Sequence, residues 1–88
     1  MSVISRVEGG YSETEIDDET VVMNLNSGEF FSLTGTARAI WLLIDGTLDR
    51  DALLAELVDT FAAKPDEVAA DLDPFLKSLT VAGLIAER

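Results

Sequence analysis

The sequence predicts an α+β fold, with a three-stranded antiparallel sheet followed by three helices. Up to Leu33, short β-rich stretches alternate apolar with polar residues and are separated by turn residues, as expected of half-buried strands. From Thr34 onward, apolar residues recur every three to four positions, as on one face of a helix. The length of 88 residues suits one small core, so we expect a single domain over residues 1–88.

The first part of the chain is polar and shows no strong periodicity. We expect residues 1–11 to form an arm, for which two outcomes stay open, pairing as a strand and fraying as a flexible segment. The first strand of the sheet is expected at Glu13–Ile16, because the acidic run at residues 17–19 breaks the apolar pattern and is typical of a turn.

A β-hairpin follows, with strands at Thr20–Leu25 and Glu29–Leu33. Both are rich in β-branched and aromatic residues, and the Asn-Ser-Gly sequence at 26–28 between them has turn chemistry. The alternation places Phe31 and Phe30 on opposite faces. The last strand of such a sheet leaves an edge to which an extended peptide can add. The alternative is that Phe30 only covers the outer face of the sheet or meets the arm.

The first two helices are bounded by capping residues. The first is predicted over residues 35–45, with Thr34 as a candidate N-cap and Gly46 at the C-terminal stop. The second starts after Asp49, also a candidate N-cap, and ends before Lys64 and Pro65. The expected buried stripes are Ala37, Ile40, Trp41 and Ile44 in the first helix, and Leu53, Leu54, Leu57, Val58 and Phe61 in the second.

The third helix is predicted to begin at Pro65, where the missing N–H is harmless, and to stop near Gly83. Pro74 lies inside this helix and predicts a bend, because proline removes the backbone hydrogen bond to residue 70. The apolar stripe of the helix is Val68, Leu72, Phe75 and Leu79.

Charge and composition exclude several classes of function. The chain has 17 acidic and 6 basic residues, no Cys and no His, and a formal net charge of −11. Without clustered Lys or Arg, binding to nucleic acid or to an anionic membrane is disfavoured. Without Cys or His, the chain lacks thiol nucleophiles, the usual general base and the commonest zinc ligands. We therefore expect a cytoplasmic protein that is not an enzyme and has no cofactor and no metal.

One group of acidic residues has the spacing of part of a calcium loop. The sixth place of such a loop needs Gly but holds Arg50, and the residues that follow are expected to be helical. Helix capping and a favourable interaction with the start of a helix explain the same acids more simply. The residues concerned are Asp45, Thr47, Asp49, Asp51 and Glu56.

Together, the order of elements and several motifs resemble a known family. Residues 12–86, which include VVMNLNSGEFFSLTGTARAIWLLIDG, are similar to the PqqD-like family of leader-peptide-binding domains, the RiPP recognition elements. The second and third helices match this family mainly by spacing. The residues that carry the resemblance are Leu25, Gly28, Phe30, Phe31, Leu33, Ala37, Ile40, Trp41, Asp45 and Gly46, then Leu79, Gly83 and Leu84.

The resemblance implies a winged-helix-like domain that binds the leader segment of a ribosomally made precursor peptide. In this family the leader adds as a strand along the third strand, in the groove towards the third helix. The flank of the helix that faces the groove stays open at this stage. Arg50 and Pro74 depart from the family's usual pattern. Carried over to this chain, the contacts would come from Glu29, Phe30, Phe31, Ser32, Leu33, Val68, Asp71, Leu72 and Phe75.

The resemblance also implies partners, namely the leader peptide and a modifying enzyme or leader peptidase. The residues do not reveal the product class, whether a lasso peptide, a radical-enzyme product or a quinone cofactor. Two other interpretations stay open. The chain could be a structural or dimerisation module whose edge strand pairs with a second copy, or a winged-helix regulator, which the net charge of −11 disfavours.

Overall fold

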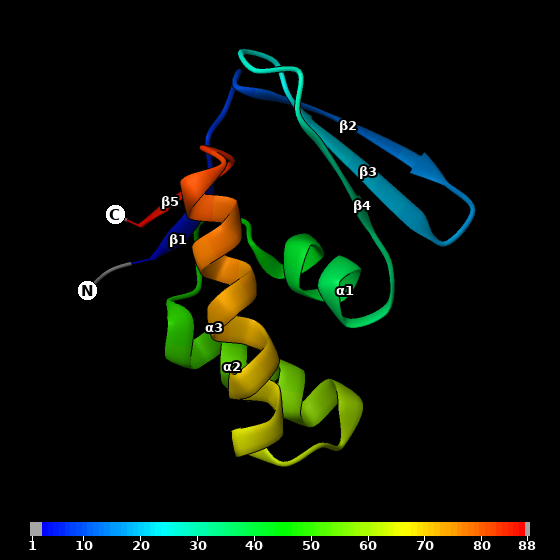
Figure 1. The fold of residues 1–88 in the computed structure, drawn as a ribbon. Helices are drawn as coiled ribbons and strands as arrows, with labels where there is room; N and C mark the ends of the chain where they lie inside the picture. The colour runs from blue at the N-terminus through cyan, green and yellow to red at the C-terminus, as the bar shows by residue number, and fades with distance from the viewer. Residues whose placement is uncertain (1–2, 88) are drawn as a thin grey trace.

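The computed structural model describes residues 3–87 and confirms the predicted α+β class (Figure 1). A three-stranded antiparallel sheet in the order β2-β3-β4 is followed along the chain by three helices. A second sheet pairs the first and last strands. The elements are β1 (Ile4–Arg6), β2 (Tyr11–Ile16), β3 (Glu19–Asn24), β4 (Phe30–Leu33), α1 (Gly35–Leu43), α2 (Arg50–Phe61), α3 (Pro65–Val81) and β5 (Ile85–Glu87).

The strand β2 is longer than the sequence predicts. It begins at Tyr11 rather than Glu13, with Tyr11 opposite Asn24 of β3. The Tyr11 ring also meets the Trp41 ring edge to face, with the ring centres 5.3 Å apart. This contact joins residues 30 positions apart, so local alternation does not predict it.

The small sheet pairs β1 with β5, so the first and last strands of the described chain lie side by side (Figure 1). Of the two outcomes left open for the N-terminal arm, strand pairing occurs at Ile4–Arg6. Ile4 and Ile85 are 6% and 4% exposed and belong to the core. The sequence did not predict β5, because a three-residue strand has no periodicity and its partner lies at the far end of the chain.

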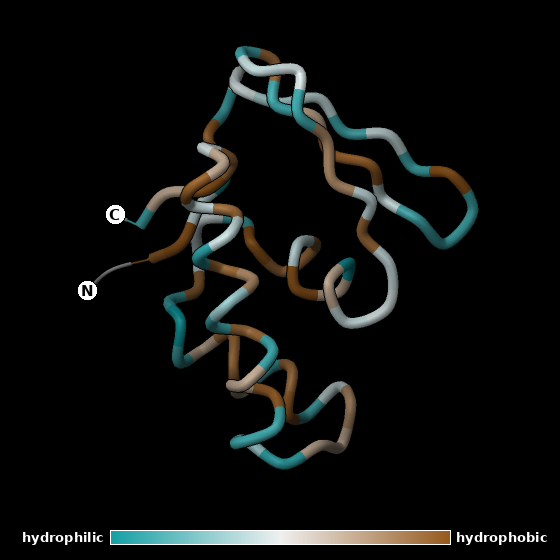
Figure 2. The backbone as a smooth tube through the Cα atoms, in the orientation of Figure 1, coloured by the Kyte–Doolittle hydropathy of each residue, from teal (hydrophilic) through white to brown (hydrophobic). Residues whose placement is uncertain are grey.

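The core lies between the helices and the inner face of the larger sheet. Apolar segments of all three helices turn towards one another, and the hydropathy colouring of Figure 2 shows their alternation with polar segments. One predicted core residue is wrong: Phe61 is 44% exposed. It is the last residue of α2, where the chain leaves the helix through the left-handed residue Ala62. The most deeply buried side chains are Thr20, Val22, Ile40, Trp41, Ile44, Leu53, Leu57, Leu72, Leu79 and Leu84.

The predicted helix boundaries are close to those observed. The Asp49 carboxylate caps α2 by accepting a hydrogen bond of 2.8 Å from the Ala52 N–H, and Pro65 occupies the first turn of α3. Thr34 occupies the N-cap position of α1, but its side chain makes no capping hydrogen bond. The helix α3 is continuous through Pro74. Among residues 3–87, none of the helices is both long and apolar enough to cross a membrane.

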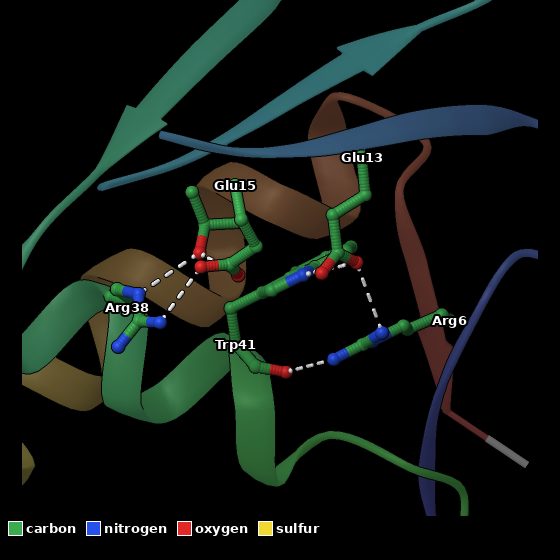
Figure 3. Close-up of polar contacts among 6 residues, drawn as sticks. Arg6, Glu13, Glu15, Arg38 and Trp41 are labelled. Atoms are coloured by element: carbon green, nitrogen blue, oxygen red, sulfur yellow. Dashed lines mark hydrogen bonds and ion pairs between the residues drawn. The ribbon is translucent and has the colours of Figure 1, made fainter. Parts of the chain in front are cut away.

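Two polar clusters fasten the larger sheet to α1 and to the N-terminal arm (Figure 3). The guanidinium carbon of Arg6 lies 4.4 Å from the centre of the Trp41 ring. The same guanidinium donates a hydrogen bond of 2.8 Å to the Trp41 backbone carbonyl. Glu13 accepts hydrogen bonds from Arg6 and from the Trp41 Nε1–H. Arg38 of α1 pairs with Glu15 of β2 at 2.8 Å. The helix α1 is therefore attached to β2 of the larger sheet by polar contacts of Arg38 and Trp41.

Candidate functional site

The strand β4 is an edge strand, with β3 on one side and no strand on the other among residues 3–87. The Asn24 N–H donates to the Glu29 carbonyl at 2.7 Å, which makes these two residues a hydrogen-bonded pair. Hydrogen-bonded and non-hydrogen-bonded pairs alternate along antiparallel strands. The backbone N–H and C=O of Phe30 and Ser32 therefore point away from β3, towards the open edge.

The side chains of β4 alternate as the sequence predicts. Phe31 and Leu33 turn inwards, where Leu33 is 3% exposed and Phe31 packs half-buried against the core. Phe30 lies on the outer face and is 66% exposed. Its partner across the ladder, Met23, is 37% exposed. The open edge thus has an apolar side chain on each of its two faces.

A groove of about 370 Å³ separates the start of β4 from the C-terminal half of α3. Its floor and walls are largely apolar, and Val81 is 80% exposed beside it. Glu29 and Lys77 add one charge of each sign. The groove is lined by Glu29, Phe31, Lys77, Ser78, Val81 and Ala82.

The structure brings together only part of the expected site. Glu29, Phe30, Phe31 and Ser32 lie at the edge or the groove, whereas Leu33, Val68 and Leu72 lie in the core. Val68 and Leu72 are 6% and 0% exposed, so their side chains support the helix from within. Phe75 packs half-buried on the core, and Asp71 is exposed on the N-terminal half of α3.

Sequence reasoning did not find the residues of α3 that line the groove, namely Lys77, Ser78, Val81 and Ala82. A signal for them was present. Val81 is apolar but lies off the buried stripe that runs from Val68 to Leu79, and an apolar residue off that stripe is left outside the core. The flank of α3 that carries Val81 therefore forms the helical wall of the groove.

The carboxylates with shifted pKa values lie away from the groove: Asp73 and Glu15 join two elements each, and Asp45 stabilises the loop after α1. Hydrogen bonds from Arg50 lower the pKa of Asp73, and hydrogen bonds from Arg38 and then Thr20 lower the pKa of Glu15. The bond from the Thr47 hydroxyl, helped by the Thr47 N–H, lowers the pKa of Asp45. Within the described residues 3–87, no cluster of three or more acidic side chains is placed to hold a metal ion.

Comparison with known proteins agrees with the predicted resemblance. The family model described as "Coenzyme PQQ synthesis protein D (PqqD)" matches residues 19–85. The chain belongs to the PqqD family. The match begins at β3 and ends in β5, so both walls of the groove lie inside the part that defines membership of the PqqD family.

A solved structure shares the fold of this PqqD-family chain. It is described as "TbiB1 in Complex with the TbiA(beta) Leader Peptide" and superposes with a TM-score of 0.79. The similarity covers 91% of this chain and 93% of that chain, at 24% sequence identity. A search of the curated proteins finds no match.

Proposed function

We propose that this chain binds the leader segment of a ribosomally made precursor peptide as a strand added to β4. The observation that carries the proposal is the open edge of β4 beside an apolar groove. Membership of the PqqD family supports it, as does the fold shared with TbiB1, which was solved with a leader peptide. The role is recognition without catalysis, as part of RiPP biosynthesis.

The edge groups determine how the peptide is held. The backbone N–H and C=O of Phe30 and Ser32 hydrogen-bond the added strand, which requires little of its sequence. Successive side chains of that strand point to opposite faces. One set enters the groove between Phe31 and Val81, and the other lies over Phe30. The peptide is therefore expected to carry apolar residues at both kinds of position.

The residues of the expected site fall into two groups, those that contact the leader and those that support the strand and helix behind the contacts. Glu29, Phe30, Phe31 and Ser32 contact the leader, while the core side chains of Leu33, Val68 and Leu72 hold the strand and helix behind them. Asp71 and Phe75 contact the leader if it extends along α3 beyond the groove. The list of proposed contacts is Glu29, Phe30, Phe31, Ser32, Leu33, Val68, Asp71, Leu72 and Phe75, extended by Lys77, Ser78, Val81 and Ala82.

The function follows from proximity. Binding of a short segment buries about 1,000 Å² and gives dissociation constants near the micromolar range, so a product can leave. A leader held beside a modifying enzyme or a leader peptidase raises the local concentration of the attached core peptide. We place this step in the cytoplasm, where precursor peptides are made.

A titration tests the proposal. The probe is the leader of the precursor peptide encoded next to this chain's gene, added to the ¹⁵N-labelled protein. The amide signals of residues 29–33 and 77–82 should shift, with a dissociation constant of about 10 µM or tighter. No binding at tens of micromolar, or shifts confined to other elements, would contradict the proposal.

A pair of variants locates the site. Val81→Asp places a charge on an exposed side chain of the groove, whereas Leu42→Asp changes an exposed side chain of α1 outside it. We expect Val81→Asp to weaken leader binding about tenfold or more and Leu42→Asp to leave it nearly unchanged. Equal effects would place the binding surface elsewhere.

Pairing of β4 with a second copy is the competing use of the same edge. Two copies would each carry a net charge of −11, and this long-range repulsion opposes association. Measuring the mass in solution with and without leader separates the two uses. A dimer that the leader does not dissociate would favour the dimerisation module.

A further inference from the structure

Asn24 joins the two walls of the groove. Its side-chain Nδ2 donates a hydrogen bond of 2.5 Å to the carbonyl of Ala82, at the C-cap of α3. Its backbone N–H donates to the carbonyl of Glu29 at 2.7 Å, next to the start of β4. Both Ala82 and Glu29 line the groove, so one residue contacts the helical wall and the strand wall.

The hydrogen-bonding capacity of the Asn24 side chain is largely used. Its Oδ1 accepts hydrogen bonds from the backbone N–H groups of Asn26 at 2.8 Å and Ser27 at 3.1 Å. Two donors at one end of the amide and a carbonyl at the other determine which end carries the nitrogen. With 8% of its surface exposed, Asn24 is a buried polar residue. Loss of its donor would therefore leave the Ala82 carbonyl with one partner fewer.

This hydrogen bond has no counterpart elsewhere across the groove. Within residues 3–87, it is the one hydrogen bond between the sheet of β2, β3 and β4 and the chain from α3 onwards. The same sheet is attached to α1 through hydrogen bonds of Arg38 and Trp41 to Thr20, Glu15 and Glu13. The spacing of β4 and α3 thus depends on apolar packing and on Asn24.

The end of α3 offers the acceptor that Asn24 needs. The last carbonyl groups of a helix lack intrahelical partners. The chain leaves α3 through Gly83, which has a φ of +76° and lets the backbone turn towards β5. A Cβ at Gly83 would lie 3.5 Å from the Asn24 Nδ2 atom, which is an ordinary van der Waals contact, so the positive φ and not a lack of space favours glycine here.

We infer that Asn24 is a positioning residue that sets the spacing between the edge of β4 and the C-terminal half of α3. Through that spacing it determines how well an extended apolar peptide fits between Phe31 and Val81. The second statement rests on the proposed function, whereas the first concerns the protein alone.

The variant Asn24→Asp isolates the bond across the groove. The carboxylate keeps an acceptor for the N–H groups of Asn26 and Ser27 but loses the donor, and it sets an oxygen against the Ala82 carbonyl. Asn24→Ser is a neutral second variant whose hydroxyl can still serve the turn but is too short to reach α3. Ser27→Ala is the matched control, because it removes a turn bond to the Glu29 N–H that does not cross the groove.

Spin labels measure the spacing without any ligand. The chain has no Cys, so Ser32→Cys on β4 and Thr80→Cys on α3 take the labels without background. Double electron–electron resonance measures the distance between the two labels. This distance should become longer or more broadly distributed in Asn24→Asp and Asn24→Ser, and should not change in Ser27→Ala. Emission of Trp41, the single tryptophan, verifies that each variant is folded.

Binding of the leader probe provides the second measurement. We expect about tenfold weaker binding for Asn24→Asp and less than about twofold for Ser27→Ala. Distances that stay unchanged in both Asn24 variants overturn the inference, and so does unchanged affinity in a widened groove. If the wild-type chain binds no leader, the proposed function fails, while the distances still decide whether Asn24 sets the spacing.

Discussion

Phe30 lies in the larger sheet with 66% of its surface exposed. Single exposed apolar side chains are common on protein surfaces, but this one faces Met23 and borders an open edge. The same strand carries the free backbone groups of Phe30 and Ser32. At the residue scale, Phe30 therefore combines backbone groups that point to the open edge with an exposed apolar side chain.

This coincidence predicts a difference between two exposed apolar residues of the sheet. Phe30→Ser and Ile16→Ser should each change the free energy of unfolding by less than about 0.5 kcal/mol, because both side chains are already more than half exposed. Leader binding should weaken about tenfold in Phe30→Ser only, since Ile16 lies at the far end of β2. Calorimetric titration measures the affinities, and equal losses would contradict the assignment of the edge.

Glu15 predicts a pH dependence of stability. Hydrogen bonds from Arg38 and Thr20 lower its pKa in the folded state. A lowered folded pKa stabilises the fold above the unfolded value, about 4.3 for glutamate, and this stabilisation is lost as the pH falls through the folded pKa. Glu15→Gln should therefore be less stable than the wild type at pH 7, and the difference should shrink below pH 4.

Urea midpoints measured between pH 7 and pH 3 check this expectation. The matched control is Glu56→Gln, because Glu56 is exposed on α2 and makes no hydrogen bond or ion pair among the described residues 3–87. Its midpoints should follow those of the wild type throughout. A deficit of Glu15→Gln that persists unchanged at pH 3 would contradict the assigned role of the carboxylate.

At the scale of elements, the helix starts differ in how they are capped. The Asp49 carboxylate accepts the Ala52 N–H at 2.8 Å, while the Thr34 side chain makes no capping bond. Asp49→Ala should lower the free energy of unfolding by about 1 kcal/mol, and Thr34→Ala by no more than a few tenths. Urea unfolding followed by Trp41 emission compares them, and equal costs would contradict the geometry.

The elements that the sequence predicted well are those with a local signal. The hairpin of β3 and β4 and the three helices follow from alternation, turn residues and apolar stripes. The strand β5 was missed, and the pairing of the arm as β1 was left open, because three residues carry no period and the pairing joins the two ends of the described chain. The edge of β4 was predicted for the same local reason, since the last strand of a meander has one neighbour.

The helical wall of the site was harder to predict. The stripe of Val68, Leu72 and Leu79 marks the face of α3 that packs on the core, and this face is unavailable to a ligand. The groove uses the adjacent flank with Val81. Periodicity identifies the buried face of a helix, but the neighbour of the next face depends on how the elements cross in space. The bend expected at Pro74 stays a prediction.

At the scale of the whole molecule, a net charge of −11 accompanies a groove whose lining is largely apolar. Apolar contacts and backbone hydrogen bonds depend weakly on salt, whereas attraction between exposed charges is screened beyond about 10 Å at 0.1 M salt. The two contributions to binding can therefore be separated by ionic strength. We expect the acidic surface to favour leaders with Lys or Arg beside the segment that pairs with β4.

Raising the salt from 0.05 M to 0.5 M should weaken leader binding, but by less than about tenfold, because the groove supplies most of the affinity. A leader whose flanking Lys and Arg are replaced by Gln should bind more weakly at low salt and lose most of the salt dependence. Calorimetric titration of both peptides measures the two slopes. A loss of about a thousandfold, as counterion release from nucleic acid produces, would mean that charge dominates recognition. Equal salt dependence for the two leaders would mean that the acidic surface does not act on the peptide.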